Sequence, residues 1–370
     1  LRLNHVKKSF GDKTVLDDCS FVFQQGKIYG LLGRNGAGKT TVFNLLTGVY
    51  KPDSGKVLLD GTDITGKNTI EINKAGIART FQNIRLFKQL SVLDNVKVGL
   101  HNKHHYSTLS GVLRLPGYRK VEKEMDEEAM ELLKVFGLDG ECDFKASNLP
   151  YGKQRKLEIA RALATEPKLL LLDEPLGALD LKLRQDMQYE LIRLKNELGI
   201  TFVFVTHDQE EALTISDTIV VMNQGYIQQI GTPEMIYNEP VNAFVADFIG
   251  DSNIINGTMI QDKVVEILGV KIPCVDEGFG CNTPVDVVIR PEDVEITEPG
   301  AGFMDGDIVS IIFKGVHYEI SIMANGYEWL VHTTKMYPVG THVGINVIPF
   351  NIQIMNKPES EDEEAVEIDA

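Results

Sequence analysis

The chain has 370 residues, with 53 acidic against 37 basic side chains and a formal net charge of −16. This excess of negative charge argues against DNA, RNA or anionic lipid as its main partner. No stretch approaches the roughly 18–20 consecutive apolar residues that cross a bilayer, and the four cysteines show neither a C-x-x-C pair nor zinc-ligand spacing, so we expect the reduced thiols of a cytoplasmic protein.

The first 65 residues alternate between apolar and polar side chains as short strands do. The segment 57–61 ends in Asp60-Gly61, a turn signal that predicts an antiparallel hairpin. An uninterrupted apolar run at 28–32 predicts a buried strand in the same region.

A glycine-rich loop of the form G-x-x-x-x-G-K-[ST] follows that run and precedes an apolar segment, 41–46, that predicts the first turns of a helix. Its glycines let backbone N–H groups curl around a polyphosphate, and the helix N-terminus adds partial positive charge. Lys39 is predicted to reach the outer phosphates and the Thr40 hydroxyl to ligate Mg²⁺. The alternative is a strand-to-helix turn that binds nothing, which the two flanking elements disfavour. The loop consists of Gly33, Arg34, Asn35, Gly36, Ala37, Gly38, Lys39 and Thr40.

Residues from about 83 to 150 have a predominantly helical pattern. Within them, 119–136 predicts a charged amphipathic helix that ends at Gly137. Just before this region, the long neutral amide of Gln82 can reach magnesium or water without adding charge. A single glutamine does not by itself indicate a metal-binding or catalytic site.

A second buried strand is predicted over 169–172, where four leucines lead directly into Asp173 and Glu174. In a parallel sheet both carboxylates then lie at the carboxyl edge, where open α/β sheets bind their ligands. We expect Asp173 to hold Mg²⁺ and Glu174 to orient and deprotonate an attacking water. Without other motifs, the two carboxylates could equally be a solvated strand end. The presence of a phosphate loop in the same chain favours a role in Mg²⁺ binding and catalysis.

Strands and helices continue to alternate through 151–235. Apolar spacing predicts a helix from about residue 183 to 198 that ends at Gly199. The β-rich segment 200–206 predicts a strand that ends in His207, whose imidazole could touch a γ-phosphate and the attacking water. A lone histidine is more often structural, and its place on the same sheet edge favours a role in the site.

From about residue 250 helical periodicity gives way to short alternating strands. The segments 318–323 and 327–332 flank Asn325-Gly326, a strong hairpin signal. The residues from Lys357 onward are dominated by Glu and Asp and predict a disordered, solvated tail.

In the order and spacing of these elements, the chain resembles the ATP-binding-cassette (ABC) ATPases over nearly all its length. The resemblance makes Asp173-Glu174 the Walker B pair and His207 the switch histidine. It makes Gln82 the Q-loop glutamine, which touches both Mg²⁺ and the attacking water. It therefore implies ATP and Mg²⁺ as cofactors, with Glu174, His207 and Gln82 in catalysis and Thr40, Gln82 and Asp173 at the metal.

Further contacts to ATP are implied by the resemblance alone. Phe10 sits where the family stacks an aromatic ring on adenine, and Thr41 continues the phosphate loop. The family's D-loop corresponds to 177–180, which places Asp180 beside the nucleotide.

The family's signature L-S-G-G-Q corresponds to residues 149–153, with three departures. Pro150 replaces the serine that contacts the γ-phosphate of the opposite subunit, and it has no N–H to donate. Tyr151 replaces a glycine and Lys153 a glutamine, whereas Gly152 and the helix N-terminus remain. The variant is similar to that of branched-chain amino-acid importer ATPases, so we expect an altered but working signature.

The implied fold is an α/β P-loop ATPase, an ABC cassette with an antiparallel β subdomain and a helical subdomain. A small all-β OB-like domain of the TOBE type, with a regulatory role, is expected to follow. The expected divisions are the ATPase domain at 1–235 with its helical subdomain at about 83–150, a linker at 236–250, the OB-like domain at 251–356 and the acidic tail at 357–370.

The resemblance also implies partners and a location. The chain is expected to form an ATP-sandwich dimer with itself at the cytoplasmic face of the cell membrane. Integral membrane permease subunits would insert a coupling helix into the groove between the helical subdomain and the Q-loop, and an extracellular solute-binding protein would act through them. No nucleic-acid partner is expected.

The two halves resemble different branches of the family. Residues 1–175 are similar to ATPases of branched-chain amino-acid importers, and those from about 176 onward to the spermidine/putrescine importer ATPase. We expect an ATP-hydrolysing importer subunit, with polyamine as the favoured solute because the extra domain and most of the length after residue 175 support it. The alternatives are branched-chain amino-acid import and an ABC ATPase without a transport role.

Overall fold

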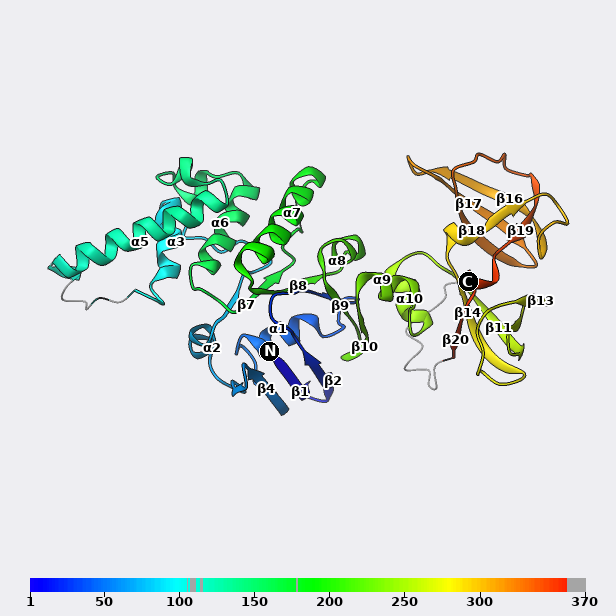
Figure 1. The fold of residues 1–370 in the computed structure, drawn as a ribbon, viewed down its shortest axis with the longest axis horizontal. Helices are drawn as coiled ribbons and strands as arrows, with labels where there is room; N and C mark the ends of the chain where they lie inside the picture. Colours follow the sequence, from blue (N-terminus) through cyan, green and yellow to red (C-terminus); the bar gives the residue numbers. More distant parts are fainter. Residues whose placement is uncertain (105, 107–110, 114–115, 178, 358–370) are drawn as a thin grey trace. The chain divides into compact units, whose positions relative to one another are not determined.

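The computed structural model describes residues 1–104, 106, 111–113, 116–177 and 179–357. The chain forms two compact units, Leu1–Pro233 and Glu234–Ala370 (Figure 1). The division therefore falls two residues before the predicted end of the ATPase domain.

A six-stranded sheet in the order β10-β9-β3-β8-β7-β6 forms the centre of the first unit. Its strands are parallel except β10, which pairs antiparallel with β9. In chain order they are β3 (Ile28–Leu32), β6 (Ile77–Arg79), β7 (Leu169–Asp173), β8 (Thr201–Thr206), β9 (Thr218–Asn223) and β10 (Tyr226–Gly231).

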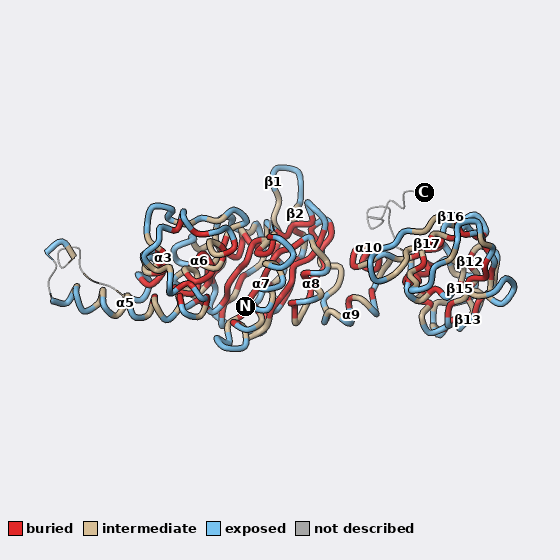
Figure 2. The backbone as a smooth tube through the Cα atoms, turned by 90° about the horizontal axis from the view of Figure 1, so that it is seen from above, coloured by how far each residue is buried: buried red, intermediate tan, exposed pale blue. Residues whose placement is uncertain are grey.

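The three middle strands β3, β8 and β7 are buried at every position, which confirms the predictions from their apolar runs (Figure 2). Strands covered on both faces need no alternation of polar and apolar residues. Two apolar clusters, one on each side of this sheet, form the core.

A four-stranded antiparallel sheet in the order β2-β1-β4-β5 packs in the same unit. The predicted hairpin is confirmed, because Leu59 pairs with Thr62 across a turn in which Asp60 and Gly61 both have positive φ, 48° and 79°. Its strands are β1 (Arg2–Phe10), β2 (Lys13–Val22), β4 (Ser54–Leu59) and β5 (Thr62–Asp63).

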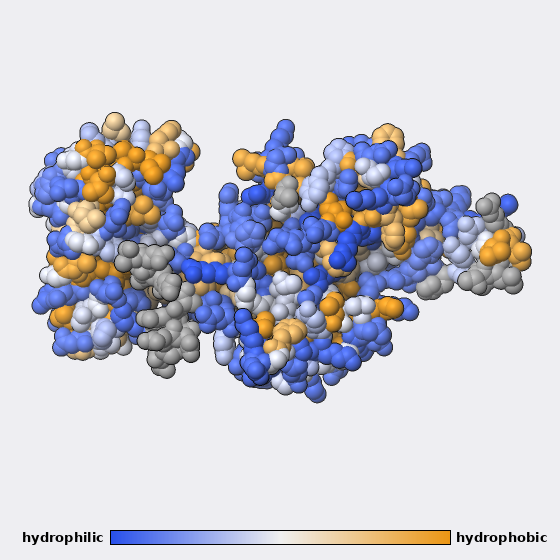
Figure 3. Space-filling model, turned by 180° about the vertical axis from the view of Figure 1, so that it is seen from behind, coloured by the Kyte–Doolittle hydropathy of each residue, from blue (hydrophilic) through white to orange (hydrophobic). Residues whose placement is uncertain are grey.

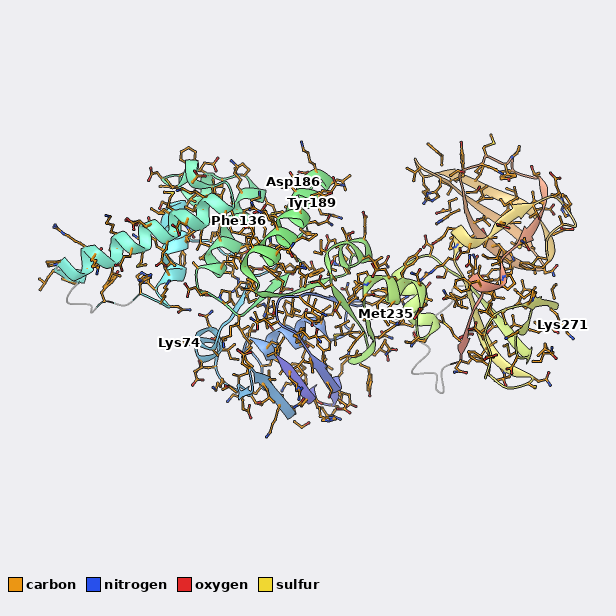
Figure 4. All side chains as sticks on the ribbon, viewed as in Figure 1. Lys74, Phe136, Asp186, Tyr189, Met235 and Lys271 are labelled. Carbon is orange, nitrogen blue, oxygen red and sulfur yellow. The ribbon has the colours of Figure 1, made fainter. Side chains whose placement is uncertain are left out.

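The helices agree with the predicted pattern. The predicted helix at 119–136 is observed as α5, and the one at 183–198 as α7, which ends at Gly199 with φ 62°. Met187, on α7, is buried, while Tyr189 is 74% exposed and lies on the outer side of the helix (Figure 4). The unit's helices are α1 (Lys39–Leu46), α2 (Thr69–Ala75), α3 (Val92–Leu100), α5 (Pro116–Val135), α6 (Tyr151–Leu163), α7 (Leu181–Leu198) and α8 (Gln209–Ile215), with the 3₁₀ turns Asp139–Glu141 and Ala146–Asn148.

Two five-stranded antiparallel sheets make up most of the second unit and share one apolar core. The predicted hairpin at 325–326 is confirmed, with Ala324 opposite Tyr327. The first sheet contains β13 (Val270–Pro273), β12 (Val264–Ile267), β11 (Asn253–Gln261), β14 (Thr283–Ile289) and β20 (Gln353–Asn356). The second contains β15 (Glu295–Thr297), β19 (His342–Asn346), β16 (Met304–Phe313), β17 (Tyr318–Ala324) and β18 (Tyr327–Thr333), and the 3₁₀ turns are Pro291–Asp293 and Pro349–Asn351.

The segment 236–250 differs from the predicted linker. It forms the second half of α9 (Pro233–Asn238) and all of α10 (Ala243–Ile249), and α10 packs on β14. Ala246 forms a small apolar cluster with Val288 and Met355, so this segment is part of the second unit. The predicted disordered tail from 358 onward lies outside the described residues.

Hydrophilic side chains predominate on the visible face of the first unit, with smaller hydrophobic patches between them (Figure 3). None of the helices in the described ranges is long and apolar enough to cross a membrane.

Candidate functional site

Three neighbouring strands deliver the predicted site residues to one edge of the six-stranded sheet. β3 ends at Leu32, which pairs with Thr206 at the end of β8, and Val205 of β8 pairs with Asp173 at the end of β7. Because the three strands are parallel, the phosphate loop, Glu174 and His207 all follow their carboxyl ends.

The phosphate loop adopts a conformation that depends on glycine. Gly36 and Gly38 have φ of 89° and 101°, a region that side chains rarely adopt. A Cβ at Gly38 would lie 2.8 Å from Leu16 Cδ2. Gly38 is also the N-cap of α1 and offers no side-chain acceptor. The first N–H groups of α1 therefore have neither an intrahelical nor a capping partner and suit an anion.

Lys39 is buried inside this loop, where its ammonium donates to the carbonyls of Gly33 and, at 3.0 Å, Arg34. Burial lowers the pKa of Lys39, and the nearby charge of Glu174 partly opposes that shift. Thr40, the next residue, is exposed. A buried cation beside free amides and an exposed hydroxyl is the donor set that a magnesium-bound polyphosphate requires.

Asp173 is held by a partner that the sequence did not reveal. Arg79, at the end of β6, donates to Asp173 Oδ2 at 2.6 Å, and both side chains are nearly buried. The same guanidinium donates to Asn44 of α1 at 2.7 Å. Arg79 thus links the Walker B strand to the helix that follows the phosphate loop.

Glu174 lies between the other two predicted catalytic side chains. Gln82 Nε2 donates to Glu174 Oε2 at 2.8 Å, and His207 Nδ1 lies 3.3 Å from Glu174 Oε1. Glu174 also has a φ of 43°, a left-handed conformation that is uncommon for a non-glycine residue. Such strain clusters at functional sites. The structure therefore brings Glu174, Gln82 and His207 together as the sequence predicted.

The signature residues begin α6. Pro150 is the N-cap and supplies no side-chain cap, so the amides of the first turn face outward without a partner from this helix. Tyr151 is 42% exposed. Gly152 is buried, and a Cβ there would lie 2.3 Å from Leu183 Cδ2. Any side chain at this position would therefore have to displace Leu183, the residue of α7 against which Gly152 packs.

Two predicted contacts to nucleotide involve side chains that have partners in their own unit. The Lys153 ammonium pairs with Glu141. The Asp180 carboxylate caps α7 by accepting from Leu183 N at 2.9 Å. Ala178 of the predicted D-loop lies outside the described residues.

Phe10 lies at the end of β1 and is 43% exposed. Its ring contacts Tyr50 edge to face, with centroids 5.0 Å apart, and Lys8 Nζ lies 5.3 Å from its centroid. An aromatic ring held from one side and exposed on the other can stack with a planar base.

A buried ion pair that sequence reasoning missed connects the signature helix to the site. Arg155 and Glu158 of α6 are each 1% exposed and pair at 2.7 Å. Arg155 also donates to the backbone carbonyls of Phe81, Gln82 and Glu174, at 2.7, 3.1 and 3.1 Å. The sequence does contain a signal for this pair, because Arg155 and Glu158 are opposite charges three residues apart on an otherwise apolar helix face.

A phosphate loop at the carboxyl edge of a parallel sheet, with a paired aspartate and a glutamate held by amide and imidazole, defines a P-loop nucleotide-binding protein. A family described as "ABC transporter" matches residues 16–177. The spermidine/putrescine import ATP-binding protein PotA of Acetivibrio thermocellus is 50% identical over 98% of this chain and 97% of its own length. The protein of that name from Clostridioides difficile is 46% identical over 96% of this chain and 98% of its own length.

Solved structures agree with the fold of the first unit. A nucleotide-free ATP-binding cassette from an ABC transporter has a TM-score of 0.58 and 34% identity over 68% of this chain and 98% of its own. A dimeric cassette in a post-hydrolysis state, bound to ADP and Pi, has a TM-score of 0.52 and 29% identity over 63% of this chain and 98% of its own. The chain belongs to the ABC transporter family of ATP-binding proteins, and it binds nucleotide through the ABC cassette.

Proposed function

We propose that this chain is the ATP-hydrolysing subunit of an ABC importer for spermidine and putrescine. The observation that carries hydrolysis is Glu174, held between Gln82 and His207 at the edge where the phosphate loop lies. The solute is inferred from relatives named for spermidine/putrescine import, which align at 45–50% identity with 96–99% of the chain. These alignments run through both halves, which favours polyamine over branched-chain amino acids.

ATP binding is assigned to the phosphate loop and its neighbours. The amides of residues 33–41 wrap the phosphates, and Lys39 exchanges its two loop carbonyls for phosphate oxygens. Mg²⁺ fits beside them and would neutralise phosphate charge when bound. The cation would be held by the Thr40 hydroxyl, the Asp173 carboxylate and the side-chain amide oxygen of Gln82. Oxygen donors are the ligands that this cation prefers. The ion pair with Arg79, at 2.6 Å, holds the Asp173 carboxylate in place.

Hydrolysis is assigned to Glu174. Its Oε2 accepts from Gln82 and its Oε1 faces His207, so the carboxylate is oriented by an amide and an imidazole. A carboxylate fixed in this way can accept the proton of an attacking water. His207 is largely exposed, with 66% of its side chain accessible, and can turn toward a γ-phosphate.

The signature residues are assigned to a second copy's nucleotide. The N-terminus of α6 offers amides at Tyr151, Gly152 and Lys153 in place of the absent serine hydroxyl. Lys153 would leave Glu141 to approach the phosphate, and Asp180 would lie beside the nucleotide at the start of α7. A two-fold dimer completes both sites at once, and the relative with ADP and Pi bound is itself dimeric.

A cavity of about 620 Å³ beside the Q-loop is the proposed docking site for the permease. It is lined by residues of β6, α3 and α6 together with Arg85 and Phe87, and the Phe87 side chain is 50% exposed. Arg85 N donates to buried Glu158 at 3.0 Å, which ties the groove to the Arg155 network. The chain would work at the cytoplasmic face of the membrane, and an extracellular binding protein would reach it through the permease.

Reconstitution with permeases tests this function. We expect ATP hydrolysis in proteoliposomes to rise severalfold with a polyamine permease and its spermidine-loaded binding protein. A branched-chain amino-acid permease with its leucine-loaded binding protein is the matched control. Stimulation only by the leucine system would replace the polyamine assignment, and ATPase activity that neither system changes would favour a role outside transport.

Replacing Phe10 with alanine should weaken ATP binding by about 1–3 kcal/mol, because base–aromatic stacking is worth that much. KM for ATP should rise while kcat changes little, since Phe10 ends a strand of the four-stranded sheet, whereas Glu174 follows a strand of the six-stranded sheet. A Phe10→Trp variant keeps a stacking surface and should retain the wild-type KM. Equal KM values for all three proteins would exclude Phe10 from the adenine site.

A further inference from the structure

The second unit contains a cluster of metal-ligating side chains remote in sequence from the nucleotide site. One ligand atom from each of Asp251, Glu319 and His332 lies within 4.8 Å of the other two. Glu319 and His332 come from β17 and β18, which lie side by side (Figure 1). The two residues are directly opposite each other in the strand register. Asp251 precedes β11. The three side chains meet only because this unit folds.

His332 is oriented as a metal ligand would be. Its Nε2 is buried, has no hydrogen-bond partner and lies 3.8 Å from Glu319 Oε2. Its Nδ1 lies 3.9 Å from Glu292 Oε2, and the other oxygen of Glu292 accepts from the Tyr237 hydroxyl at 2.5 Å. Ligating histidines usually direct the second ring nitrogen at a carboxylate, which fixes the ring and raises its basicity.

Asp251 is held in place by a buried arginine. The Arg290 guanidinium donates to the carbonyls of Gly250 and Asp251, at 2.9 and 3.4 Å, and to Ser252 Oγ at 2.6 Å. It also donates to the backbone carbonyl of Tyr237 at 2.9 Å and lies over the aromatic ring of the same residue. The segment that enters β11 is therefore fixed against the strands that carry the other two ligands.

Space and charge also fit a cation. A cavity of about 550 Å³ is lined by Asp251, Glu292, His332 and His317 among others. The ring centroids of His317 and His332 are 4.5 Å apart, so His317 is a further imidazole donor in the same cavity. Lys314 approaches Glu319 at 3.3 Å and is half exposed, so it can yield its place to an ion at little cost.

We propose that Asp251, Glu319 and His332 bind a divalent transition-metal ion, with Zn²⁺ as the best match. One imidazole nitrogen and two carboxylates are ligands that Zn²⁺ accepts, at about 2.0–2.2 Å, with a fourth position for water or His317. Ligand atoms in such a tetrahedron are about 3.4 Å apart, and those of the cluster lie within 4.8 Å of one another, so each pair needs to approach by at most about 1.4 Å. The ion would fasten the segment before β11 to β17 and β18.

Zinc titration of the chelator-treated full-length chain tests the site, with Mg·ATP in excess to occupy the nucleotide site. The wild type should bind one more Zn²⁺ per chain than a His332→Gln/Glu319→Gln variant. A His342→Gln variant is the matched control, because His342 is an exposed histidine of the same unit that pairs with Asp307 at 2.8 Å. Replacing Glu292 with glutamine should keep the stoichiometry and weaken the affinity about 10–100-fold.

Thermal unfolding separates metal binding from a folding defect. With chelator the double variant should unfold at the wild-type temperature, and Zn²⁺ should raise only the wild-type and His342→Gln values. When Co²⁺ replaces Zn²⁺, the wild type should show visible absorption and the His332→Gln/Glu319→Gln variant should show none. Equal Zn²⁺ stoichiometry in wild type and double variant, or no Zn²⁺ bound by the wild type, would overturn the proposal.

Discussion

Replacing Glu174 with glutamine is expected to lower the rate of ATP hydrolysis by about 10²–10⁴-fold, the contribution typical of a general base. The amide keeps the size of the carboxylate but cannot accept the proton of the attacking water. ATP binding should be unchanged, because Lys39 and the loop amides are intact. Phosphate release under saturating ATP measures the first effect, and equilibrium binding of labelled ATP measures the second.

The matched control for this change is Glu166→Gln. Glu166 is an exposed carboxylate of the same unit that pairs with Lys103 at 2.8 Å, outside the site. The Glu166→Gln variant should hydrolyse ATP at the wild-type rate. If the Glu174 variant retained activity within a few-fold of the wild type, another group would have to be the base.

Replacing Arg155 with methionine is expected to destabilise the first unit by about 3–5 kcal/mol, because Glu158 would remain buried without its partner. For a unit of this length the unfolding temperature should fall by about 6–20 °C. A double variant with both residues changed to methionine should recover most of that loss, since apolar pairs often replace buried ion pairs without cost.

Activity should not recover with stability in the double variant. Arg155 also holds the carbonyls of Phe81, Gln82 and Glu174, so both variants should hydrolyse ATP slowly. Lys156→Met, on the same helix, controls for the loss of a positive charge. A double variant as active as the wild type would show that the ion pair is structural and does not position the catalytic groups.

Local patterns in the sequence predicted the central strands and the phosphate loop. The run 28–32 and the four leucines before Asp173 are continuous and fully buried, and the Gly38 conformation is a property of one residue. These features depend on neighbours in the chain, which a sequence displays directly. The grouping of Glu174 with Gln82 and His207 followed from the family resemblance and from the shared sheet edge.

The contacts that sequence reasoning missed join distant segments. Arg79 and Asp173 are separated by 94 residues, and Arg155 and Phe81 by 74. Nothing in the local pattern identifies such partners. The helix α10 was a different case, because Phe244 and Phe248 have helical spacing and both are buried. The prediction of a linker at 236–250 did not use this spacing.

The central claim is that this chain hydrolyses ATP in sites that two copies complete together. A structure of the Glu174→Gln variant with Mg·ATP tests it most directly. We expect a two-fold dimer in which each γ-phosphate lies between Lys39 and His207 of one subunit and the start of α6 of the other. A dimer or monomer in which ATP occupies the phosphate loop while the start of α6 contacts no nucleotide would contradict it.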